Sequence, residues 1–571
     1  MPDFSKLPRY APRRFVPGDF NPSDWKQIEI CYDQLAERNL ATPDALEQFL
    51  RDWSELNDAI REESTRRYIA MTCQTDDKQA ADAYKYFVTE IAPRIKPREN
   101  ELEKLYLASP ARCLLSAERY AVLDREVAAR DAIFRQANVA LETQEELLSQ
   151  EYQTLVGAMT VQFDGAEYTL PQLYPVLEET DRARREAAWR AMAERRFADR
   201  ERIDGILDHM IALRTQIASH AGFANYRDYK FAQLQRFDYT PDDCFDFHEA
   251  VEKHVVPLIR KIQSRRRAQM GLDSLRVWDT AVDPLGRAPL RPFKTTQEFI
   301  DTCERVFARV HPELSEQFRE MEHQGMLDLE NRKGKAPGGY QELLPESRIP
   351  FIFMNSVGTD GDVNTLLHEG GHAFNAFATR DEWLSSYRHP PMEFSEVASM
   401  AMELLGAPYL EGFYSAADAD RSRIQHLESI TGILCWIATV DAFQHWLYTH
   451  PDHSHAEGNA AWVSIYQRFA GDVDWSGLEP YLEVMWHRQL HIFEVPFYYI
   501  EYGIAQLGAL QVWRNMRQNH TAAIAAYRQG LALGGSKPLP EIYEAAGITF
   551  KFNAETVAPL MEMLAEELSL N

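Results

Sequence analysis

Two histidines and a glutamate lie close together in residues 364–375, a segment with the pattern of a helix. His368 and His372 are four residues apart, so their side chains lie one helical turn from each other and can bind one metal ion. Glu369 is rotated by about 100° from His368, so its carboxylate can face a water molecule beside the metal. This His-Glu-x-x-His pattern predicts a zinc site at which Glu369 is the general base of a hydrolytic reaction.

A catalytic zinc ion takes three protein ligands and keeps one position open. Three glutamates in the following segment are candidates for the third ligand: Glu393, Glu396 and Glu403. Glu396 and Glu403 are seven residues apart and share a helix face, so one could bind the metal while the other orients a histidine. Glu393 follows two prolines at the start of a helix, where a capping role explains it more simply. Glu396 is our working choice for the ligand.

The segment around the histidines is apolar on both flanks, with Leu366, Leu367, Ala373, Phe374 and Phe377. Two histidines and a glutamate buried together would be costly without a metal ion, which favours a metal site over a chance pattern on a surface helix. Gly370 and Gly371 each cost on the order of 1 kcal/mol in a helix relative to alanine. Close approach of another chain element, at the metal site or simply in tight packing, would explain that cost.

The composition places the chain among globular proteins. It has 571 residues, of which 45% are hydrophobic and 26% charged. The formal net charge of −26 argues against a nucleic-acid partner, because phosphate binding needs clustered lysine and arginine. The same charge disfavours binding to anionic membranes. We read the acidity first as a source of solubility.

The six cysteines are far apart and include no Cys-x-x-Cys pair, so nothing in their spacing indicates a disulfide framework or a thiolate metal site. We expect reduced, mostly buried cysteines that behave as small hydrophobic residues. The N-terminal residues lack the apolar core of a signal peptide, and residues 430–440 are too short to span a bilayer. These observations predict a cytoplasmic protein. His445 is expected to pack against the neighbouring Trp446.

Helical patterns fill most of the chain. Thr42 and Pro43 have the residue types of an N-cap and a first helical position, and residues 20–155 are typical of long antiparallel helices. From Asp362 onward the chain is predicted to be helical almost to its end, with Asp362 as the N-cap of the metal helix. The fold prediction is therefore mainly α.

Two short β segments interrupt the helices. Residues 158–170 alternate in polarity around Asp164-Gly165, which is a hairpin signal. Residues 350–355 form a short apolar strand that could line a cleft beside the metal helix. Between the helices and this strand, residues 331–342 have the composition of a flexible linker.

A tyrosine-rich segment lies far downstream of the metal helix, with Tyr498, Tyr499 and Tyr502 following His491. A neutral phenol close to a developing oxyanion can stabilise it, and such donors matter most where water is excluded. The alternative is that these tyrosines are aromatic core with ordinary hydrogen-bond partners.

Four stretches together resemble one family. The first is His368-Glu-Gly-Gly-His372-Ala-Phe followed by Glu396-x-x-Ser399-x-x-x-Glu403. The others are residues 338–340 with 350–355, residues 491–503, and residues 534–536 with 546–548. They are similar to the zinc peptidases of the thimet oligopeptidase group, and in particular to their bacterial branch, oligoendopeptidase F. The resemblance runs from about residue 180 to about residue 565.

The resemblance implies a helical ellipsoid with a deep central channel, one small β-sheet or hairpin near the cleft, and one zinc ion per chain at the channel floor. It implies that His368, His372 and Glu396 bind the metal, that Glu403 supports a ligand, and that Glu369 is the base. By the same resemblance, Tyr499, Tyr502 and His491 assist catalysis, while Gly339, Tyr340 and Tyr498 contact the substrate. The spacing between His491 and the tyrosines differs slightly from that of thimet-type members.

These inferences predict a zinc oligoendopeptidase that cuts short peptides internally. The expected organisation is an N-terminal helical region, residues 1–175, followed by a catalytic region, residues 176–571. One alternative is a zinc carboxypeptidase with a similar channel, and another is a peptide-binding protein of the same fold with weak catalysis. A purely structural zinc site is disfavoured, because such sites fill all four positions with protein ligands. Neither the oligomeric state nor zinc over another divalent metal follows from the sequence.

Overall fold

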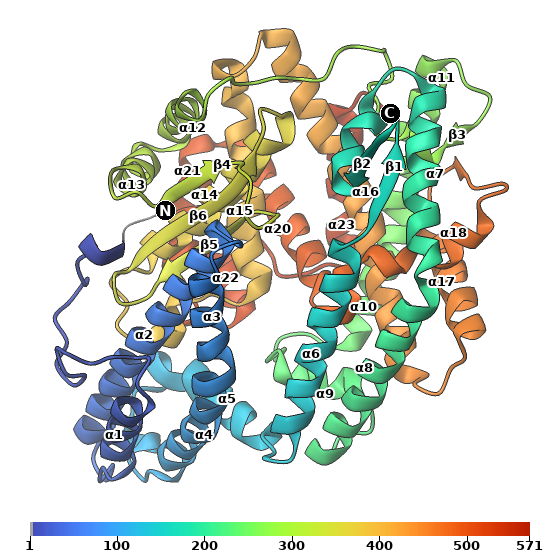
Figure 1. Ribbon diagram of the computed structural model, residues 1–571. Helices are drawn as coiled ribbons and strands as arrows, with labels where there is room; N and C mark the ends of the chain where they lie inside the picture. The colour runs from blue at the N-terminus through green and yellow to red at the C-terminus, as the bar shows by residue number, and fades with distance from the viewer. Residues whose placement is uncertain (1–3, 571) are drawn as a thin grey trace. The chain divides into compact units, whose positions relative to one another are not determined.

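The computed structural model describes residues 4–570 and groups the chain into two compact, interleaved units. Unit 1 comprises Met1–Phe134, Leu290–Ser422 and Gly508–Phe550, and unit 2 comprises Arg135–Pro289, Arg423–Leu507 and Lys551–Asn571. Helices dominate both units (Figure 1), so the predicted mainly α fold is confirmed. The sequence predicted two consecutive regions, residues 1–175 and 176–571, whereas each unit is built from three separate stretches of the chain. The two predicted regions stay a prediction.

The helices of unit 1 that lie wholly within it are α1 Trp25–Ala36, α2 Pro43–Cys73, α3 Lys78–Tyr86, α4 Ala92–Ala108, α5 Ala117–Ile133, α12 Thr296–Val310, α13 Pro312–His323, α14 Asp360–Ala378, α15 Met392–Gly406, α21 His520–Leu533 and α22 Leu539–Ala545. The start of α2 is as predicted: Thr42 is the N-cap and its hydroxyl accepts a hydrogen bond from the Ala45 amide, with Pro43 at the first position. A core of buried apolar residues joins α1, α2, α4 and α5.

The helices of unit 2 are α6 Asn138–Gly157, α7 Arg182–Ala198, α8 Arg200–Ala221, α9 Tyr226–Gln233, α10 Pro241–Ala250, α11 Val256–Met270, α17 His455–Phe469, α18 Glu479–Glu483, α19 Leu490–Glu494 and α23 Ala554–Glu567. Two long helices, α16 Ala416–Thr449 and α20 Tyr499–Gln518, contribute residues to both units. Strand β3 (Leu275–Arg276) pairs in parallel with β7 (Val473–Asp474). None of the helices in the described chain combines the length and apolarity needed to cross a membrane.

The predicted hairpin in unit 2 is confirmed. Strand β1 (Thr160–Phe163) pairs antiparallel with β2 (Ala166–Thr169). The turn residues Asp164 and Gly165 have φ angles of 50° and 81°. Two consecutive positive φ angles are the geometry of a type I′ turn, which matches the right-handed twist of a two-residue hairpin.

Unit 1 contains a three-stranded sheet in the order β4-β6-β5. Strand β6 (Ile349–Ser356) runs parallel to β4 (Leu327–Glu330) and antiparallel to β5 (Tyr340–Leu344). Almost every residue of β6 is buried, since the strand lies between its two neighbours and against α14 (Figure 1). The sequence predicted the central strand but missed β5, whose residues were assigned in part to a linker.

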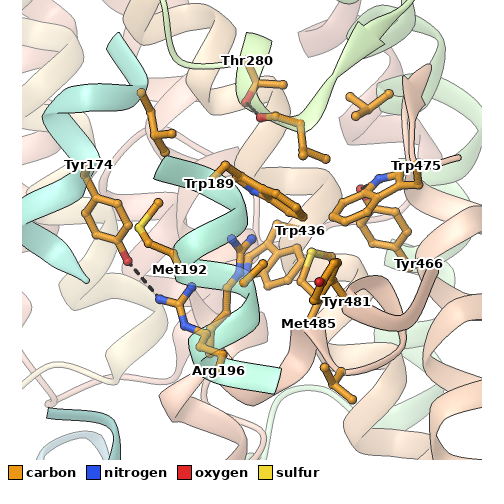
Figure 2. A pocket seen from close by; sticks show the side chains of 16 residues that line it. Tyr174, Trp189, Met192, Arg196, Thr280, Trp436, Tyr466, Trp475, Tyr481 and Met485 are labelled. Atoms are coloured by element: carbon orange, nitrogen blue, oxygen red, sulfur yellow. Dashed lines mark hydrogen bonds between the residues drawn. The ribbon is translucent and has the colours of Figure 1, made fainter. Parts of the chain in front are cut away.

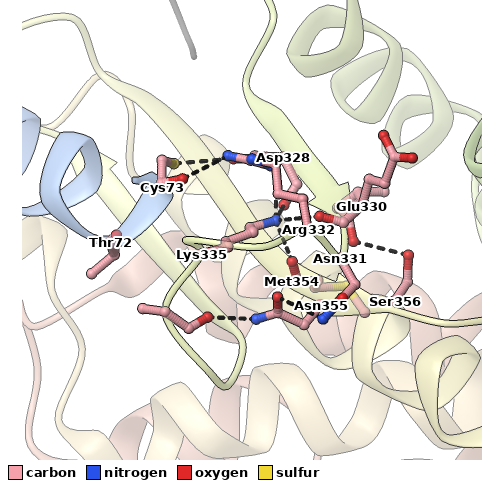
Figure 3. Close-up of polar contacts among 12 residues, drawn as sticks. Thr72, Cys73, Asp328, Glu330, Asn331, Arg332, Lys335, Met354, Asn355 and Ser356 are labelled. Atoms are coloured by element: carbon pink, nitrogen blue, oxygen red, sulfur yellow. Dashed lines mark hydrogen bonds and ion pairs between the residues drawn. The ribbon is translucent and has the colours of Figure 1, made fainter. Parts of the chain in front are cut away.

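The expected flexible linker before β5 is instead anchored by a buried lysine (Figure 3). The side chain of Lys335 has no exposed surface, and its ammonium donates to the carboxylate of Asp328 at 3.0 Å and to the Glu330 carbonyl at 3.0 Å. It also donates to the Met354 carbonyl of β6 and lies 4.4 Å from the centre of the Phe353 ring. These contacts tie Lys335 to β4 and β6, and the flexibility of the rest of the segment stays a prediction.

The N-terminus of the metal helix differs slightly from the prediction. Thr359, and not Asp362, is the N-cap of α14. Asp362 is the third helical residue and its carboxylate accepts a hydrogen bond from the Thr359 amide at 2.8 Å, which completes a capping box. The sequence pattern identified a residue of the cap but placed the helix start three residues late.

Candidate active site

The predicted metal-binding residues come together on two packed helices of unit 1. His368 and His372 project from α14, and Glu396 projects from α15. The Nε2 atoms of His368 and His372 lie 3.4 Å and 3.6 Å from Oε2 of Glu396. One ligating atom from each residue lies within 4.8 Å of the other two, the spacing of groups that can share one metal ion.

Two glycines allow other elements to come this close to α14. A Cβ atom built on Gly371 would lie 2.3 Å from the Ala398 carbonyl oxygen and 2.6 Å from the Ser399 Cα atom of α15. A Cβ atom on Gly370 would lie 2.7 Å from the Phe307 ring. The helical cost of both glycines is therefore explained by packing: Gly371 sets the approach of the helix that carries Glu396.

Each of the three candidate ligand side chains has a hydrogen-bond partner on a neighbouring residue. Nδ1 of His368 lies 2.7 Å from Oε1 of Glu403, and Nδ1 of His372 lies 3.3 Å from the Ser395 hydroxyl. The Ser399 hydroxyl donates to Oε2 of Glu396 at 3.0 Å. Such partners fix the ring tautomer and orientation that a metal ligand needs. The sequence reasoning anticipated Glu403 but assigned no role to either serine, although both lie within three residues of Glu396.

The carboxylate of Glu369 is buried close to the candidate metal ligands. The residue is 6% exposed, and Oε2 of its carboxylate has no hydrogen-bond partner within the described structure. Burial raises the pKa of Glu369 to about 7, although the nearby His368 and a hydrogen bond from the Gln341 backbone act in the opposite direction. A buried carboxylate with one unpartnered oxygen, next to three candidate metal ligands, is the arrangement expected of a group that exchanges a proton with water.

The charge states of two of the three donors suit a divalent cation. The third donor, His368, must lose a proton to bind one, because burial lowers its pKa but hydrogen bonds to Glu396 and Glu403 outweigh burial and raise that pKa. Burial raises the pKa of Glu396, but the His372 and His368 rings and the Ser399 hydrogen bond outweigh it, so the pKa falls to about 2. Burial lowers the pKa of His372 to about 4, which keeps that ring neutral. An ionised carboxylate and a neutral imidazole are the forms that bind zinc.

The predicted tyrosine cluster also assembles, within unit 2. The His491 ring centre lies 4.7 Å from that of Tyr499 and 5.9 Å from that of Tyr502. Tyr498 lies 5.2 Å from Tyr502 and 6.1 Å from His491. Tyr499 is buried, and burial raises its pKa to about 12, whereas Tyr498 and Tyr502 are partly exposed. The phenols of Tyr498 and Tyr502 are therefore more accessible as donors than that of Tyr499.

A strained turn precedes these tyrosines. Phe497 has a φ angle of 66°, which is unfavourable for a bulky side chain. The Gln444 side chain accepts a hydrogen bond from the Phe497 amide, and the Arg236 guanidinium donates to the Phe497 carbonyl. Arg236 also pairs with Glu501 at 2.9 Å. The surrounding structure thus holds the backbone that leads into α20 in one conformation.

Two models of known protein families match this chain. The model of peptidase family M3 matches residues 176–561, and that of the peptidase M3 N-terminal domain matches residues 15–129. The first match alone spans more than half of the chain. The chain belongs to peptidase family M3.

Individual relatives of this M3 chain cover different shares of it. A structure of PZ peptidase A with an inhibitor superposes with a TM-score of 0.90 and 30% identity, covering 97% of this chain and 99% of the other. Oligopeptidase PepF of Bacillus subtilis (strain 168) is 22% identical over 61% of this chain, and group B oligopeptidase PepB of Streptococcus agalactiae serotype III (strain NEM316) is 24% identical over 42%. These matches span 52% of PepF and 39% of PepB, so the chain matches about half of these curated relatives or less.

Two residues where β5 begins, Gly339 and Tyr340, were expected to contact substrate. Tyr340 opens β5 and stacks on Phe353 with ring centres 4.7 Å apart, and its hydroxyl lies 2.5 Å from that of Thr72. A Cβ atom on Gly339 would lie 3.4 Å from the Phe353 carbonyl oxygen and 3.4 Å from the Thr365 methyl group. Tyr340 therefore packs within unit 1, and substrate contact by either residue stays a prediction.

A separate cavity in unit 2 of the M3 chain has a different chemistry (Figure 2). Its volume is about 290 Å³, and aromatic side chains line it: Tyr174, Trp189, Trp436, Tyr466, Trp475 and Tyr481. The guanidinium of Arg196 donates to the Tyr174 hydroxyl at 3.3 Å at its edge. Its lining includes neither histidine nor carboxylate, so its chemistry differs from that of the candidate active site.

Removing the partner of His368 should weaken metal binding. We expect Glu403→Ala to lower the zinc affinity about 10- to 100-fold, because Nδ1 of His368 loses the carboxylate that orients the ring. Competition with a chromogenic chelator measures this affinity. Glu403→Gln keeps an acceptor oxygen and should retain most of it; equal affinities in wild type and Glu403→Ala would show that the contact does not support the ligand.

Proposed function

We propose that this protein is a zinc-dependent endopeptidase that hydrolyses internal bonds of short peptides. One observation carries the proposal: Glu369, a buried carboxylate with one unpartnered oxygen, lies on the same helix as two histidines whose ring nitrogens approach Glu396. Membership of peptidase family M3 supports the same activity. Zinc is the metal that a donor set of two imidazoles and one carboxylate favours.

In this proposal His368, His372 and Glu396 hold the metal. When bound, zinc supplies a Lewis acid that polarises the scissile carbonyl and lowers the pKa of water. Glu369 accepts the proton of the attacking water and then delivers it to the leaving amine. Its pKa of about 7, raised by burial, matches a group that must both take up and release a proton near neutral pH.

The tyrosine cluster supplies the second part of the proposal. We infer that Tyr502, with Tyr499 as the alternative, donates a hydrogen bond to the oxyanion of the tetrahedral intermediate, and that His491 and Tyr498 assist. The partial exposure of Tyr502 supports this choice over the buried Tyr499, and both tyrosines lie in the segment that resembles the oligoendopeptidase F motif. The proposal includes a deep channel through the helical fold, which would admit short peptides and exclude folded proteins.

Removing the hydroxyl of Tyr502 should distinguish a role as oxyanion donor from a role of the ring in packing. We expect Tyr502→Phe to lower kcat about a hundredfold with little change in KM, because an oxyanion donor acts mainly in the transition state. Steady-state kinetics on one fluorogenic peptide measures both constants. Tyr168→Phe in the hairpin of the same unit is a matched control and should be silent; a Tyr502→Phe enzyme with unchanged kcat would rule out the assignment.

The experiment that tests the function uses a mixed peptide library with and without a chelator, read by mass spectrometry. We expect internal cleavage that stops when the metal is removed and returns with added zinc. A peptide blocked at both ends separates the two enzymatic alternatives, because a carboxypeptidase would leave it intact. Cleavage that persists in the chelator, or the absence of cleavage in zinc, would contradict the proposal.

The compartment proposed for this activity is the cytoplasm. The described residues include all six cysteines, and no disulfide links any two of them. Thiols in this state are usual in reducing compartments, where disulfides are rare. Short peptides are the proposed partners, and nucleic acid and membrane are not expected.

A further inference from the structure

A second group of metal-ligand side chains lies in unit 2, on two helices that the proposed hydrolytic site does not use. Cys244 and His248 are four residues apart on α10, and Asp441 and His445 are four residues apart on α16. On each helix, this spacing places the two side chains one turn apart on the same face. One ligating atom each from Cys244, Asp441 and His445 lies within 4.8 Å of the other two.

This group is enclosed, and part of its bonding capacity is unmet. Cys244 and Asp441 have no exposed surface, and His445 is 4% exposed. Nδ1 of His445 and Oδ1 of Asp441 have no hydrogen-bond partner in the described structure. Each such buried group costs about 1–3 kcal/mol when it is left unsatisfied. A metal ion bound within this group would give one of these atoms a partner.

His248 prepares the carboxylate for this role. Its Nε2 lies 2.8 Å from Oδ2 of Asp441, while Nε2 of His445 lies 3.3 Å from the same oxygen. Oδ1 of Asp441 stays open. Because aspartate binds a metal through a carboxylate oxygen, this open atom is a ligand atom that the group can offer.

We propose that Cys244, Asp441 and His445 bind a second divalent metal ion of the zinc type, with His248 orienting the carboxylate of Asp441. A thiolate and a carboxylate carry two negative charges, which a dication neutralises inside the core. The sulfur and imidazole donors exclude magnesium and calcium, which take oxygen ligands. Because the group is buried, this ion does not contact substrate.

The proposed ion lies close to the turn that precedes the tyrosine cluster. The sequence predicted that His445 packs against Trp446, but its ring lies 5.2 Å from that of Phe497 and 4.9 Å from that of Phe245. Phe497 is the strained residue of the turn before Tyr499, and its amide is held by Gln444, the neighbour of His445 in α16. Fixing His445 on a metal therefore fixes one wall of the turn that leads into the tyrosines.

The test uses the full-length protein reconstituted with cobalt(II) in place of zinc. A cysteine ligand gives a thiolate-to-cobalt charge-transfer band in the near ultraviolet, and the proposed hydrolytic site contains no sulfur. We expect wild type to bind two ions per chain and to show the band. Cys244→Ser should bind one ion and lose the band, while His368→Ala should lose one ion and keep it. The second variant makes failure at one site distinguishable from failure at the other.

Cys435→Ser is the matched control, because Cys435 is a buried cysteine on α16 outside the group. It should keep both ions and the band. Anomalous scattering at the zinc edge from wild-type crystals gives a second measurement that needs no variant to fold, and we expect a peak between α10 and α16. One ion per chain in wild type, or a band that survives Cys244→Ser, would overturn the proposal.

Discussion

Glu369→Gln is expected to lower peptide hydrolysis about a thousandfold while leaving zinc bound. Glutamine has nearly the same shape as glutamate but cannot accept the proton of the attacking water, so the transition state loses its base and the metal ligands stay in place. The buried Oε2 of Glu369, which has no partner in the described structure, leaves no second hydrogen bond to be broken by the change. Activity on a fluorogenic peptide should therefore fall, while the zinc content measured by mass spectrometry should stay the same.

Two comparisons make this result specific. Glu411→Gln changes an exposed glutamate of the same unit and should leave both activity and zinc unchanged. The free energy of unfolding of Glu369→Gln should not fall, because a buried carboxylate is replaced by a neutral group. A variant that hydrolyses peptides at the wild-type rate would refute the general-base role, and one that loses zinc would place Glu369 among the ligands.

Gly371→Ala should be the most damaging small substitution in unit 1. Its methyl group would lie 2.3 Å from the Ala398 carbonyl oxygen, so α14 and α15 must move apart. Overpacking of this kind costs about 3 kcal/mol where the contacted atoms are backbone and cannot rotate away. Because α15 carries Glu396, the same movement pulls a metal ligand from the two histidines. We expect a lower free energy of unfolding and a loss of zinc affinity together.

The control lies on the same helix. Gly361 is in the first turn of α14, and a Cβ atom there would meet nothing closer than the Thr359 hydroxyl at 3.9 Å. Gly361→Ala should therefore raise the free energy of unfolding by roughly 0.5–1 kcal/mol through helix propensity. Urea titration of both variants gives the sign of each change. Equal stability of Gly371→Ala and wild type would show that the two helices are not in forced contact.

The metal-binding residues could be predicted because their geometry is local. The spacing of His368 and His372 fixes their shared face in any α-helix, and the apolar flanks indicate that this face is buried. Glu396 followed only with help from the resemblance, since Glu403 has equivalent helical phase. The structure separates the two roles through the 2.7 Å contact of Glu403 with His368. The hairpin at Asp164-Gly165 was predictable for the same reason, because its turn chemistry lies in adjacent residues.

Features that depend on distant segments could not be predicted from one sequence. The group on α10 and α16 joins Cys244 to Asp441, and the four-residue spacing within each helix does not show that these two helices meet. The division into units was hidden for the same reason, because three separate stretches build each one. The contact of Lys335 with the Met354 carbonyl of β6 was also hidden, because the two residues lie on different segments. Local pattern predicts elements, whereas tertiary contacts decide which of them meet.

The interleaving of the units has a consequence for biosynthesis. Helices α14 and α15 carry the proposed metal ligands, but α21, from the last segment of unit 1, closes over them: Tyr527 donates to the Ala398 carbonyl at 2.6 Å, and Asn375 donates to the Leu531 carbonyl at 3.0 Å. A ribosome-bound chain that has not yet reached residue 508 contains all three ligands but lacks this clamp. Maturation of the metal site is thereby postponed until translation is nearly finished, which would keep an incomplete hydrolase from acting beside its own nascent chain.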